Sequence, residues 1–237
     1  MKKGKVIRII ILIILAAALI ISGFKLITTL SKLSGEKKQI EKLAEETEQG
    51  ENLFEKNSDM ICWLDIEGTE ISYPVMYTPD DPEYYLHRDF DGEYSYSGMP
   101  FLDSRCDIDK SSNLIIYGHN MKTGKMFHDL LKYENESFYK NHKYIQFDTI
   151  YGNGTYEVIA AFRTHILTEK EDGFRYYQFF NAEDKSAFNQ YVSGCKALTG
   201  YTIDTDASYG DSLLTLSTCA YHTDNGRFVV VAKKLTP

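Results

Sequence analysis

The chain has 237 residues, of which 43% are hydrophobic and 25% charged, and this size allows one domain with a well-buried core. Its net charge is -8, so there is no excess of Lys or Arg to neutralise phosphates, and nucleic acid is excluded as the expected partner. The six histidines lack the short spacings of metal ligands, and no metal site is expected.

The N-terminus combines a basic tail with a long apolar segment. Lys and Arg residues in positions 1–8 precede an apolar run over 9–28, which is close to the roughly 20 residues that a helix needs to cross a bilayer. The positive-inside rule then predicts residues 1–8 as a cytoplasmic tail and 9–28 as a single transmembrane anchor, with the rest of the chain outside the cell. A cleaved signal peptide is the alternative, but its apolar core would be shorter and a small-x-small site would follow it. We therefore expect an uncleaved anchor.

Residues 29–58 are polar, with good helix formers of mixed charge, and predict a helical stalk that spaces the anchor from a catalytic domain at 59–237. Within that domain, two β-rich runs at 61–66 and 71–77 flank the turn residues Glu67-Gly68-Thr69 and predict a hairpin, in which Pro74 indicates an edge or a bulge. Further strands are predicted at 113–117, 144–147, 156–163, 213–217 and 228–233.

Two helices are predicted between these strands, at 125–133 and at 182–198. The second has an apolar stripe with Asn181 placed as its N-cap, and Cys195 lies on that stripe as a core thiol. The four cysteines show no paired spacing, and we expect none to be bridged. Many strands with few helices favour a closed or nearly closed barrel with helical insertions.

Cys219 is the candidate nucleophile. It ends the alternating run at 215–219 and borders the polar, turn-forming segment 220–226. A cysteine at the point where a strand opens into a surface loop can be exposed and still be held rigidly by the strand. For an arbitrary cysteine, a buried strand position is the more common case.

A nucleophilic cysteine needs a base or ion-pair partner, because a free thiol is mostly protonated at neutral pH. His119 follows Gly118 directly after an apolar run at 114–116, so it projects from a strand end. His222 is the rival, three residues from Cys219, but it lies in a flexible-looking loop. The histidines at 87, 128, 142 and 165 lack a strand-end setting and are expected at the surface.

Arg227 begins the last predicted strand. In a hairpin it would neighbour Cys219 and place a permanent cation beside the thiol, able to bind an oxyanion or a substrate carbonyl. From its position alone, an ordinary salt-bridging surface arginine is the more common case.

Together these motifs resemble the sortase family, and specifically its class B branch. The matching segments are Thr-Leu-Ser-Thr-Cys at 215–219, Gly-Arg-Phe-Val-Val-Val-Ala-Lys at 226–233, Asn-Leu-Ile-Ile-Tyr-Gly-His-Asn-Met-Lys at 113–122, and the blocks Trp63–Val75, Tyr84–Phe90 and Gly98–Arg105. The resemblance runs from about residue 58 to the C-terminus.

The resemblance implies a mainly β fold, namely a closed eight-stranded sortase-type β-barrel with N-terminal helices and a long helix inserted before the cysteine strand. It also implies a transpeptidase that needs no cofactor. Its nucleophile would cleave a C-terminal sorting signal (Asn-Pro-x-Thr-like or related) of a secreted protein after Thr, through a thioacyl intermediate. A peptidoglycan precursor amine would then resolve this intermediate. By position, Leu86, Tyr117 and Ser217 match residues that line the peptide groove of class B members.

Two departures from the family pattern affect substrate choice. Ala220 stands where many members have an acidic residue after the cysteine, and Asp80-Asp81-Pro82-Glu83 stands where an Asn often precedes the Tyr-Tyr-Leu block. A pilus-type sortase that joins subunits through Lys, another extracellular Cys-His peptidase, and a non-catalytic membrane-tethered binding module are the alternatives.

Overall fold

The computed structural model describes residues 2–48, 52–149 and 152–235. These residues divide into two compact units, one ending at Leu43 and the other beginning at Ala44. Helix α1 (Lys2–Glu48) carries the basic tail, the apolar run and part of the predicted stalk. It is the one helix of the described residues that is long and apolar enough to cross a membrane.

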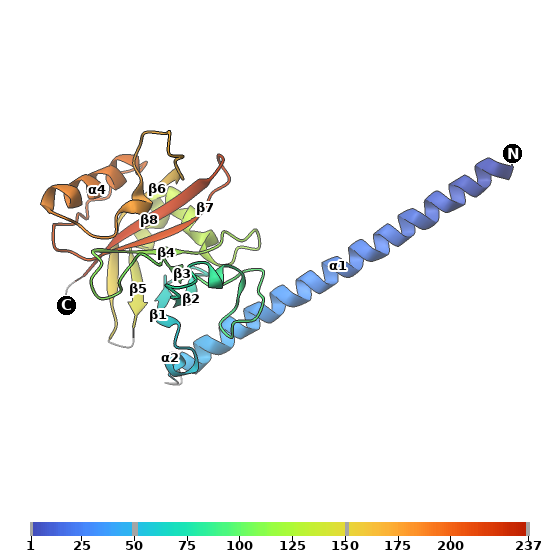
Figure 1. Ribbon diagram of the computed structural model, residues 1–237, viewed down its shortest axis with the longest axis horizontal. Helices are drawn as coiled ribbons and strands as arrows, with labels where there is room; N and C mark the ends of the chain where they lie inside the picture. Colours follow the sequence, from blue (N-terminus) through green and yellow to red (C-terminus); the bar gives the residue numbers. More distant parts are fainter. Residues whose placement is uncertain (1, 49–51, 150–151, 236–237) are drawn as a thin grey trace. The chain divides into compact units, whose positions relative to one another are not determined.

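The second unit is built on a closed barrel of eight strands in the spatial order β1-β2-β3-β4-β7-β8-β6-β5. In chain order the strands are β1 (Met60–Asp65), β2 (Ser72–Met76), β3 (Phe101–Leu102), β4 (Asn113–Tyr117), β5 (Tyr144–Asp148), β6 (Thr155–His165), β7 (Leu213–Cys219) and β8 (Gly226–Lys234). The ribbon diagram shows the long β6, β7 and β8 side by side (Figure 1). This barrel confirms the fold class that the sequence predicts.

Seven of the strands lie where the sequence pattern predicts them. The pattern does not predict β3, because two residues are too few to show an alternation. Pro74 pairs with Trp63 of β1, whereas β2 pairs with β3 only at Met76. Pro74 therefore has a paired strand on one side only. This agrees with the expected edge position.

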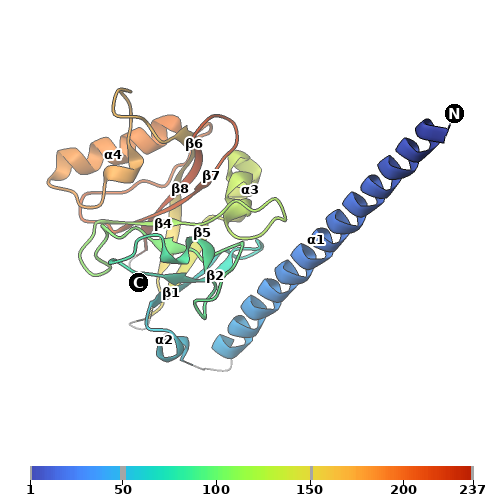
Figure 2. The same ribbon diagram turned by 45° about the vertical axis from the view of Figure 1, so that its right-hand side comes forward.

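The helical elements are short apart from α1 and α4. They are α2 (Leu53–Lys56), η1 (Tyr84–His87), η2 (Phe127–Glu134), α3 (Glu136–Asn141), η3 (Tyr176–Gln178) and α4 (Lys185–Leu198). The turned view shows α4 beside β6 and the strands next to it (Figure 2). It lies in the connection that precedes β7, as the resemblance implies.

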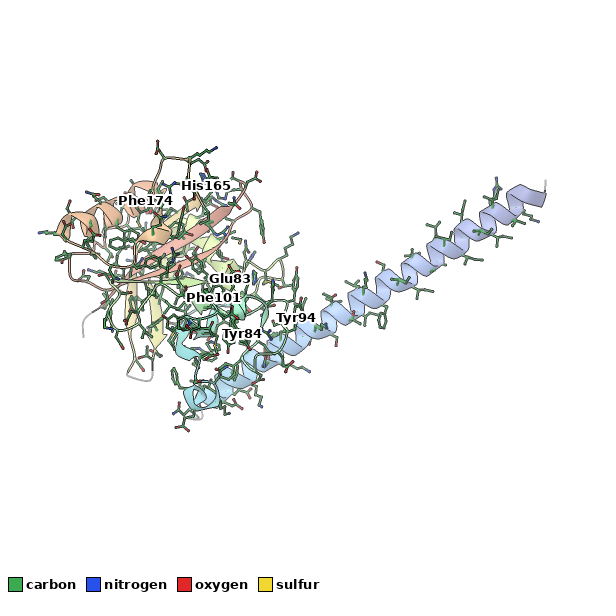
Figure 3. All side chains as sticks on the ribbon, in the orientation of Figure 1. Glu83, Tyr84, Tyr94, Phe101, His165 and Phe174 are labelled. Atoms are coloured by element: carbon green, nitrogen blue, oxygen red, sulfur yellow. The ribbon has the colours of Figure 1, made fainter. Side chains whose placement is uncertain are left out.

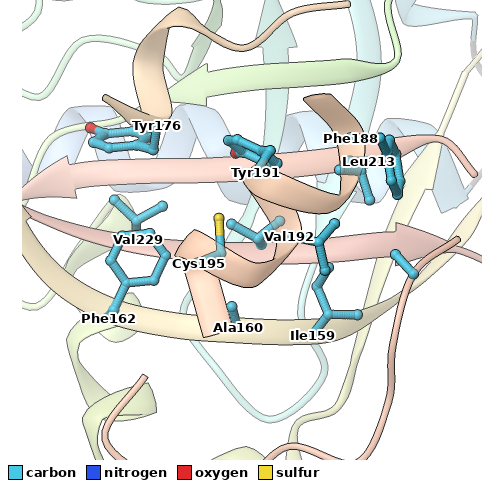
Figure 4. Packing of buried hydrophobic residues seen from close by; sticks show 12 residues of the cluster. Ile159, Ala160, Phe162, Tyr176, Phe188, Tyr191, Val192, Cys195, Leu213 and Val229 are labelled. Atoms are coloured by element: carbon cyan, nitrogen blue, oxygen red, sulfur yellow. The ribbon is translucent and has the colours of Figure 1, made fainter. Parts of the chain in front are cut away.

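Helix α4 covers the outer face of the barrel and forms a second hydrophobic core there. Its side chains Phe188, Tyr191, Val192 and Cys195 pack among residues of β6, β7 and β8 (Figure 4). The first six residues of β7 are buried on both faces for this reason, since the barrel interior covers one face and α4 the other. Cys195 is fully buried, which confirms its predicted place in the core.

Two local predictions were wrong. The N-cap of α4 is Asp184, whose Oδ1 accepts from Ala187 N at 2.8 Å, while Asn181 Oδ1 accepts from Ser112 N at 3.2 Å. Asp and Asn cap helices about equally well, so intrinsic preference does not favour either residue as the N-cap. Asn181 is engaged with Ser112, and Asp184 therefore caps α4.

The segment predicted as a helix at 125–133 is the 3₁₀ helix η2. Its buried residues Phe127, Leu130 and Tyr133 are spaced three apart, which is the repeat of a 3₁₀ helix and aligns them on one edge.

Asn113 joins β4 to β7, to the segment after η3 and, through the Tyr191 hydroxyl at 3.3 Å, to α4. Its Nδ2 donates to Phe179 O at 2.8 Å and its Oδ1 accepts from Thr215 Oγ1 at 2.8 Å, all in a fully buried position. Asn113→Ala leaves those groups unpaired, and we expect a loss of about 2–3 kcal/mol in the free energy of unfolding, measured by denaturant titration of Trp63 fluorescence. Asn189→Ala, at an exposed position of α4, should change it by no more than about 0.5 kcal/mol.

Candidate active site

A cavity of about 550 Å³ opens where β4 and β7 end. Its wall contains six of the residues that the sequence singles out for catalysis or peptide binding, namely Leu86, Tyr117, His119, Ser217, Cys219 and Arg227. Glu83 and Phe101 belong to the same wall and are labelled among the side chains in Figure 3. The candidate residues, which come from distant parts of the sequence, therefore share one cavity.

Strand register explains how the thiol and the imidazole meet. β4 and β7 run parallel with Tyr117 opposite Ser217, so His119 and Cys219, each two residues further on, emerge at the same rim of the barrel. Cys219 is partly exposed, whereas the other three cysteines are buried. A partly exposed thiol at a strand end is accessible to a substrate and held by the sheet.

Hydrogen bonds fasten the two strand ends together. Thr218 Oγ1 donates to Gly118 O at 2.7 Å, and Asn120 Nδ2 donates to Cys219 O at 2.8 Å. Asn120 Oδ1 is in turn held by His128 Nδ1 at 2.8 Å, so this partly buried histidine supports the site from behind.

Gly118 is required by close packing. A Cβ at this position would lie 2.7 Å from the ring of Phe127, which is fully buried. Gly118 is needed for this close approach and not for an unusual backbone angle, because its φ is not in the left-handed region.

The segment around η1 holds His119 in place. His119 Nε2 lies 2.9 Å from Leu86 O, and in the neutral imidazole this nitrogen is the donor, which leaves Nδ1 unprotonated. The rings of His87 and His119 stack at 5.4 Å between centroids, with 24° between their planes. Burial lowers the pKa of His119 below its usual value. The charge of His87 lowers this pKa further, and the hydrogen bond to Leu86 raises it by less than burial lowers it. The imidazole is therefore neutral at pH 7.

Gly98 fixes the position of the Leu86 carbonyl. It has a φ of +59°, and a Cβ there would lie 2.2 Å from Leu86 O. In the sequence the 98–105 block is visible only as a family motif, and His87 is expected at the surface. His87 is indeed exposed, but no local pattern indicates that it stacks on His119.

His222 lies outside the cavity wall. It is exposed, its ring packs over Gly226, and its charge acts on Glu134. Of the two rival histidines, the structure brings His119 into the cavity with Cys219.

Arg227 pairs directly with Cys219 across the β7–β8 hairpin, as predicted. Its Nη1 donates to Gly226 O at 3.0 Å and to Asn225 O at 3.3 Å. Within residues 2–48, 52–149 and 152–235 no carboxylate forms an ion pair with it, so the charge of its guanidinium is uncompensated. Such a cation in a cavity wall can bind an oxyanion or a carbonyl oxygen.

Another part of the wall is a polar network that the sequence did not reveal. Tyr117 donates from its hydroxyl to Asp103 Oδ2 at 3.0 Å, and Arg105 binds the same carboxylate through Nε at 2.9 Å and Nη2 at 2.7 Å. Burial alone would raise the pKa of Asp103, but the hydrogen bonds and charge of Arg105 outweigh it and hold that pKa below its usual range. Asp103 is therefore ionised.

Ser217 is bound from the η3 side. Its Oγ lies 2.7 Å from the hydroxyl of Tyr176, whose pKa burial raises to about 12. Ser217 is buried while still reaching the cavity wall, so it is a fixed feature of that wall.

A partly exposed thiol, a neutral imidazole and an unpaired guanidinium in one cavity fit nucleophilic acyl transfer through a thioester. The described parts of the chain contain no group of three or more His, Cys, Asp or Glu side chains placed to hold a metal ion.

Comparison with known proteins gives a consistent result. The Sortase domain family model matches residues 64–235. Sortase B of Staphylococcus aureus is 32% identical over 239 residues, which cover 94% of this chain and 95% of that protein.

Two solved structures extend the comparison. A Staphylococcus aureus sortase B–substrate complex superposes with a TM-score of 0.75 at 30% identity, over 86% of this chain and 98% of that one. A sortase B complexed with triglycine gives a TM-score of 0.76 at 29% identity, over the same shares.

Gly98→Ala tests whether the Leu86 carbonyl positions His119. The new Cβ displaces that carbonyl, and we expect the rate of Cys219-dependent peptide cleavage to fall at least about tenfold. Gly210→Ala is the matched control, because Gly210 also has a positive φ (+105°) but nothing within 4 Å of the added Cβ. Gly210→Ala should lose about 1–2 kcal/mol of stability through the same kind of backbone strain, and its cleavage rate should stay unchanged. Equal rates for the two variants would contradict the assigned role of Gly98.

Proposed function

The chain belongs to the sortase family, as a class B cysteine transpeptidase, and on that premise we propose that Cys219 is its nucleophile, His119 its acid–base partner and Arg227 its oxyanion-binding cation. The observation that carries this assignment is the single cavity lined by a partly exposed thiol, a neutral imidazole and an uncompensated guanidinium.

In the first step, Cys219 Sγ attacks the carbonyl carbon of the Thr in a sorting signal and its proton passes to His119. The carbonyl becomes an oxyanion, which Arg227 stabilises. The intermediate collapses with cleavage of the C–N bond, and the imidazolium donates its proton to the departing amine. The product is a thioester between the Thr carbonyl and Cys219.

In the second step, an acceptor amine attacks the thioester carbon. His119, neutral again, takes the proton from the attacking nitrogen, and the C–S bond breaks to release Cys219. An amide replaces the thioester, so the surface protein is joined to the acceptor without external energy. The lowered pKa of His119 supports this role, because the imidazole must be unprotonated to accept a proton at pH 7.

The proposed substrate is a secreted protein with a C-terminal sorting signal of the Asn-Pro-x-Thr-like type, which Leu86, Tyr117 and Ser217 bind along the cavity. Their shared place in the wall with Cys219 supports this proposal. The resemblance to class B members favours Asn-Pro-x-Thr over other signals, while Ala220 and Pro82 are departures that bear on the choice of sequence.

The proposed acceptor is an amine of a peptidoglycan precursor. A similar sortase B has been crystallised with triglycine, which supports a small peptide amine more than a folded pilus subunit. The family indicates an enzyme of the cell surface, and we propose that the apolar part of α1 anchors it in the membrane with the catalytic domain outside.

Mass spectrometry of the full-length protein in detergent tests the chemistry. Incubation with Asn-Pro-x-Thr, Ser-Pro-x-Thr and Leu-Pro-x-Thr peptides should give a thioacyl adduct on Cys219 and cleavage after Thr, most strongly with the first. His119→Ala should lower the rate by about 10²–10⁴-fold, the range of a lost acid–base catalyst. His222→Ala should stay within about twofold.

Two outcomes would contradict the assignment. Cleavage by Cys219→Ala would exclude this thiol as the nucleophile. Loss of activity in His222→Ala with retention in His119→Ala would exchange the roles of the two histidines.

Labelling of intact cells tests the topology. A membrane-impermeant maleimide should react at Cys219, because this thiol is partly exposed and the other three are buried. Cys219→Ala should abolish the signal. Labelling that appears only after lysis would contradict an extracellular catalytic domain.

A further inference from the structure

The imidazole of His119 has one hydrogen bond to the part of the chain that the structure describes, from Nε2 to Leu86 O at 2.9 Å. This bond fixes one atom of the ring but not the plane of the ring, because the χ2 torsion of histidine has broad minima. The lone pair of Nδ1 lies in that plane, so a tilt of the ring would misalign it for proton transfer. A base in this setting needs a second contact that sets the plane.

His87 supplies a contact of this kind. Its ring lies 5.4 Å from that of His119 between centroids, with 24° between the planes, which is the geometry of an offset stack. His119 belongs to the cavity wall and His87 does not, so the contact reaches His119 from outside the cavity. His87 can therefore restrain the imidazole without occupying the space that a substrate would fill.

The loop at 88–95 holds His87 in this position. Ser95 N donates to His87 O at 3.0 Å, and a bridge between Arg88 and Tyr94 joins the two ends of the loop. The ring of Tyr94, labelled in Figure 3, lies 6.4 Å from that of His87 with 28° between the planes. The rings of Tyr94, His87 and His119 thus form one stacked series with His87 in the middle.

The same loop is tied by its own polar groups. Asp89 Oδ1 accepts from Asp91 N at 3.1 Å and from Glu93 N at 2.9 Å, and Arg88 Nη1 donates to Gly92 O at 2.8 Å. A catalytic side chain is held accurately when the residues that support it are themselves fixed by hydrogen bonds and packing. His87 meets that condition, although its ring is exposed.

We propose that His87 is a positioning residue for the transpeptidation, whose ring sets the plane of the His119 imidazole and keeps Nδ1 aligned for proton transfer. This inference rests on the proposed role of His119 and adds the residue that orients it. Stacking needs an aromatic ring but no exchangeable proton, so the role differs from that of a second acid–base histidine.

Steady-state kinetics of the full-length protein in detergent tests the proposal, with the peptide that the wild type cleaves best. The assays are run at pH 8, where imidazoles are largely neutral. His87→Ala removes the ring and should lower kcat about threefold to tenfold, the factor that one aromatic pair contributes. KM should stay within about twofold, because His87 is outside the cavity wall. His87→Phe retains a ring and should restore kcat to within about twofold of the wild type.

His142→Ala is the matched control. The ring of His142 also stacks on an aromatic ring, that of Phe138, at 3.8 Å between centroids and with 15° between the planes. Neither residue belongs to the cavity wall. This variant should keep the kcat of the wild type within about twofold.

NMR of the same protein with carbon-13 in its histidine rings tests the stack itself. A ring that packs on His119 shifts the resonances of the His119 ring protons through its ring current. These resonances should move in His87→Ala, whereas His87→Phe should keep a ring-current shift and His142→Ala should leave them unchanged.

Three outcomes would overturn the proposal, namely an unchanged kcat in His87→Ala, no recovery in His87→Phe, and His119 resonances that do not respond to His87→Ala. The proposed function fails by a different result, which is wild-type activity in His119→Ala. Loss of activity in His119→Ala together with full activity in His87→Ala would remove this inference alone.

Discussion

The parallel pairing of β4 with β7 is the constraint on which the site depends. Side chains alternate between the two faces of a strand, so a slip of one residue would turn Ser217 and Tyr117 away from the cavity. The register is held by burial on both faces of β7 and by the Asn113–Thr215 hydrogen bond between the strands. Most of the barrel thus acts as a frame that brings two strand ends to one rim.

Around this frame, each candidate residue is held by a different part of the chain. Backbone from the η1 segment fixes His119, the hairpin of β7 and β8 fixes Arg227, and the segment after β3 supplies Asp103 and Arg105. These parts also contact one another directly, because Tyr117 of β4 donates to Asp103 and the backbone before β3 bonds to Tyr85 of η1, so a change in one part can reach the others.

Much of the fold could be predicted from the sequence, because periodic apolar runs and turn residues mark seven of the eight strands and the hairpin that joins Cys219 to Arg227. Shorter features depend on tertiary contacts and have no such signal. β3 has only two residues, and η2 takes a 3₁₀ repeat in place of the predicted helix. Helix α4 is capped by Asp184, while Asn181 is engaged with Ser112. Leu86, Tyr117 and Ser217 were predicted from the resemblance to class B sortases. The structure shows that they share one cavity, and their roles in peptide binding stay predictions. The stack of His87 on His119 and the hydrogen bond from Tyr117 to Asp103 arise between separate segments of the chain, so no local pattern reveals them.

The burial of three cysteines has a consequence for the durability of the protein under oxidation. Burial raises the pKa of Cys106 to about 11 and also raises those of Cys62 and Cys195, so these sulfurs remain protonated and out of reach of oxidants. Oxidative damage is then concentrated at Cys219, which has no accessible partner thiol in the chain to trap a sulfenic acid as an internal disulfide. Reversal of that damage falls to a reductant supplied from outside the molecule. With Cys219 as the proposed nucleophile, the fraction of active enzyme would then follow the redox state of its surroundings.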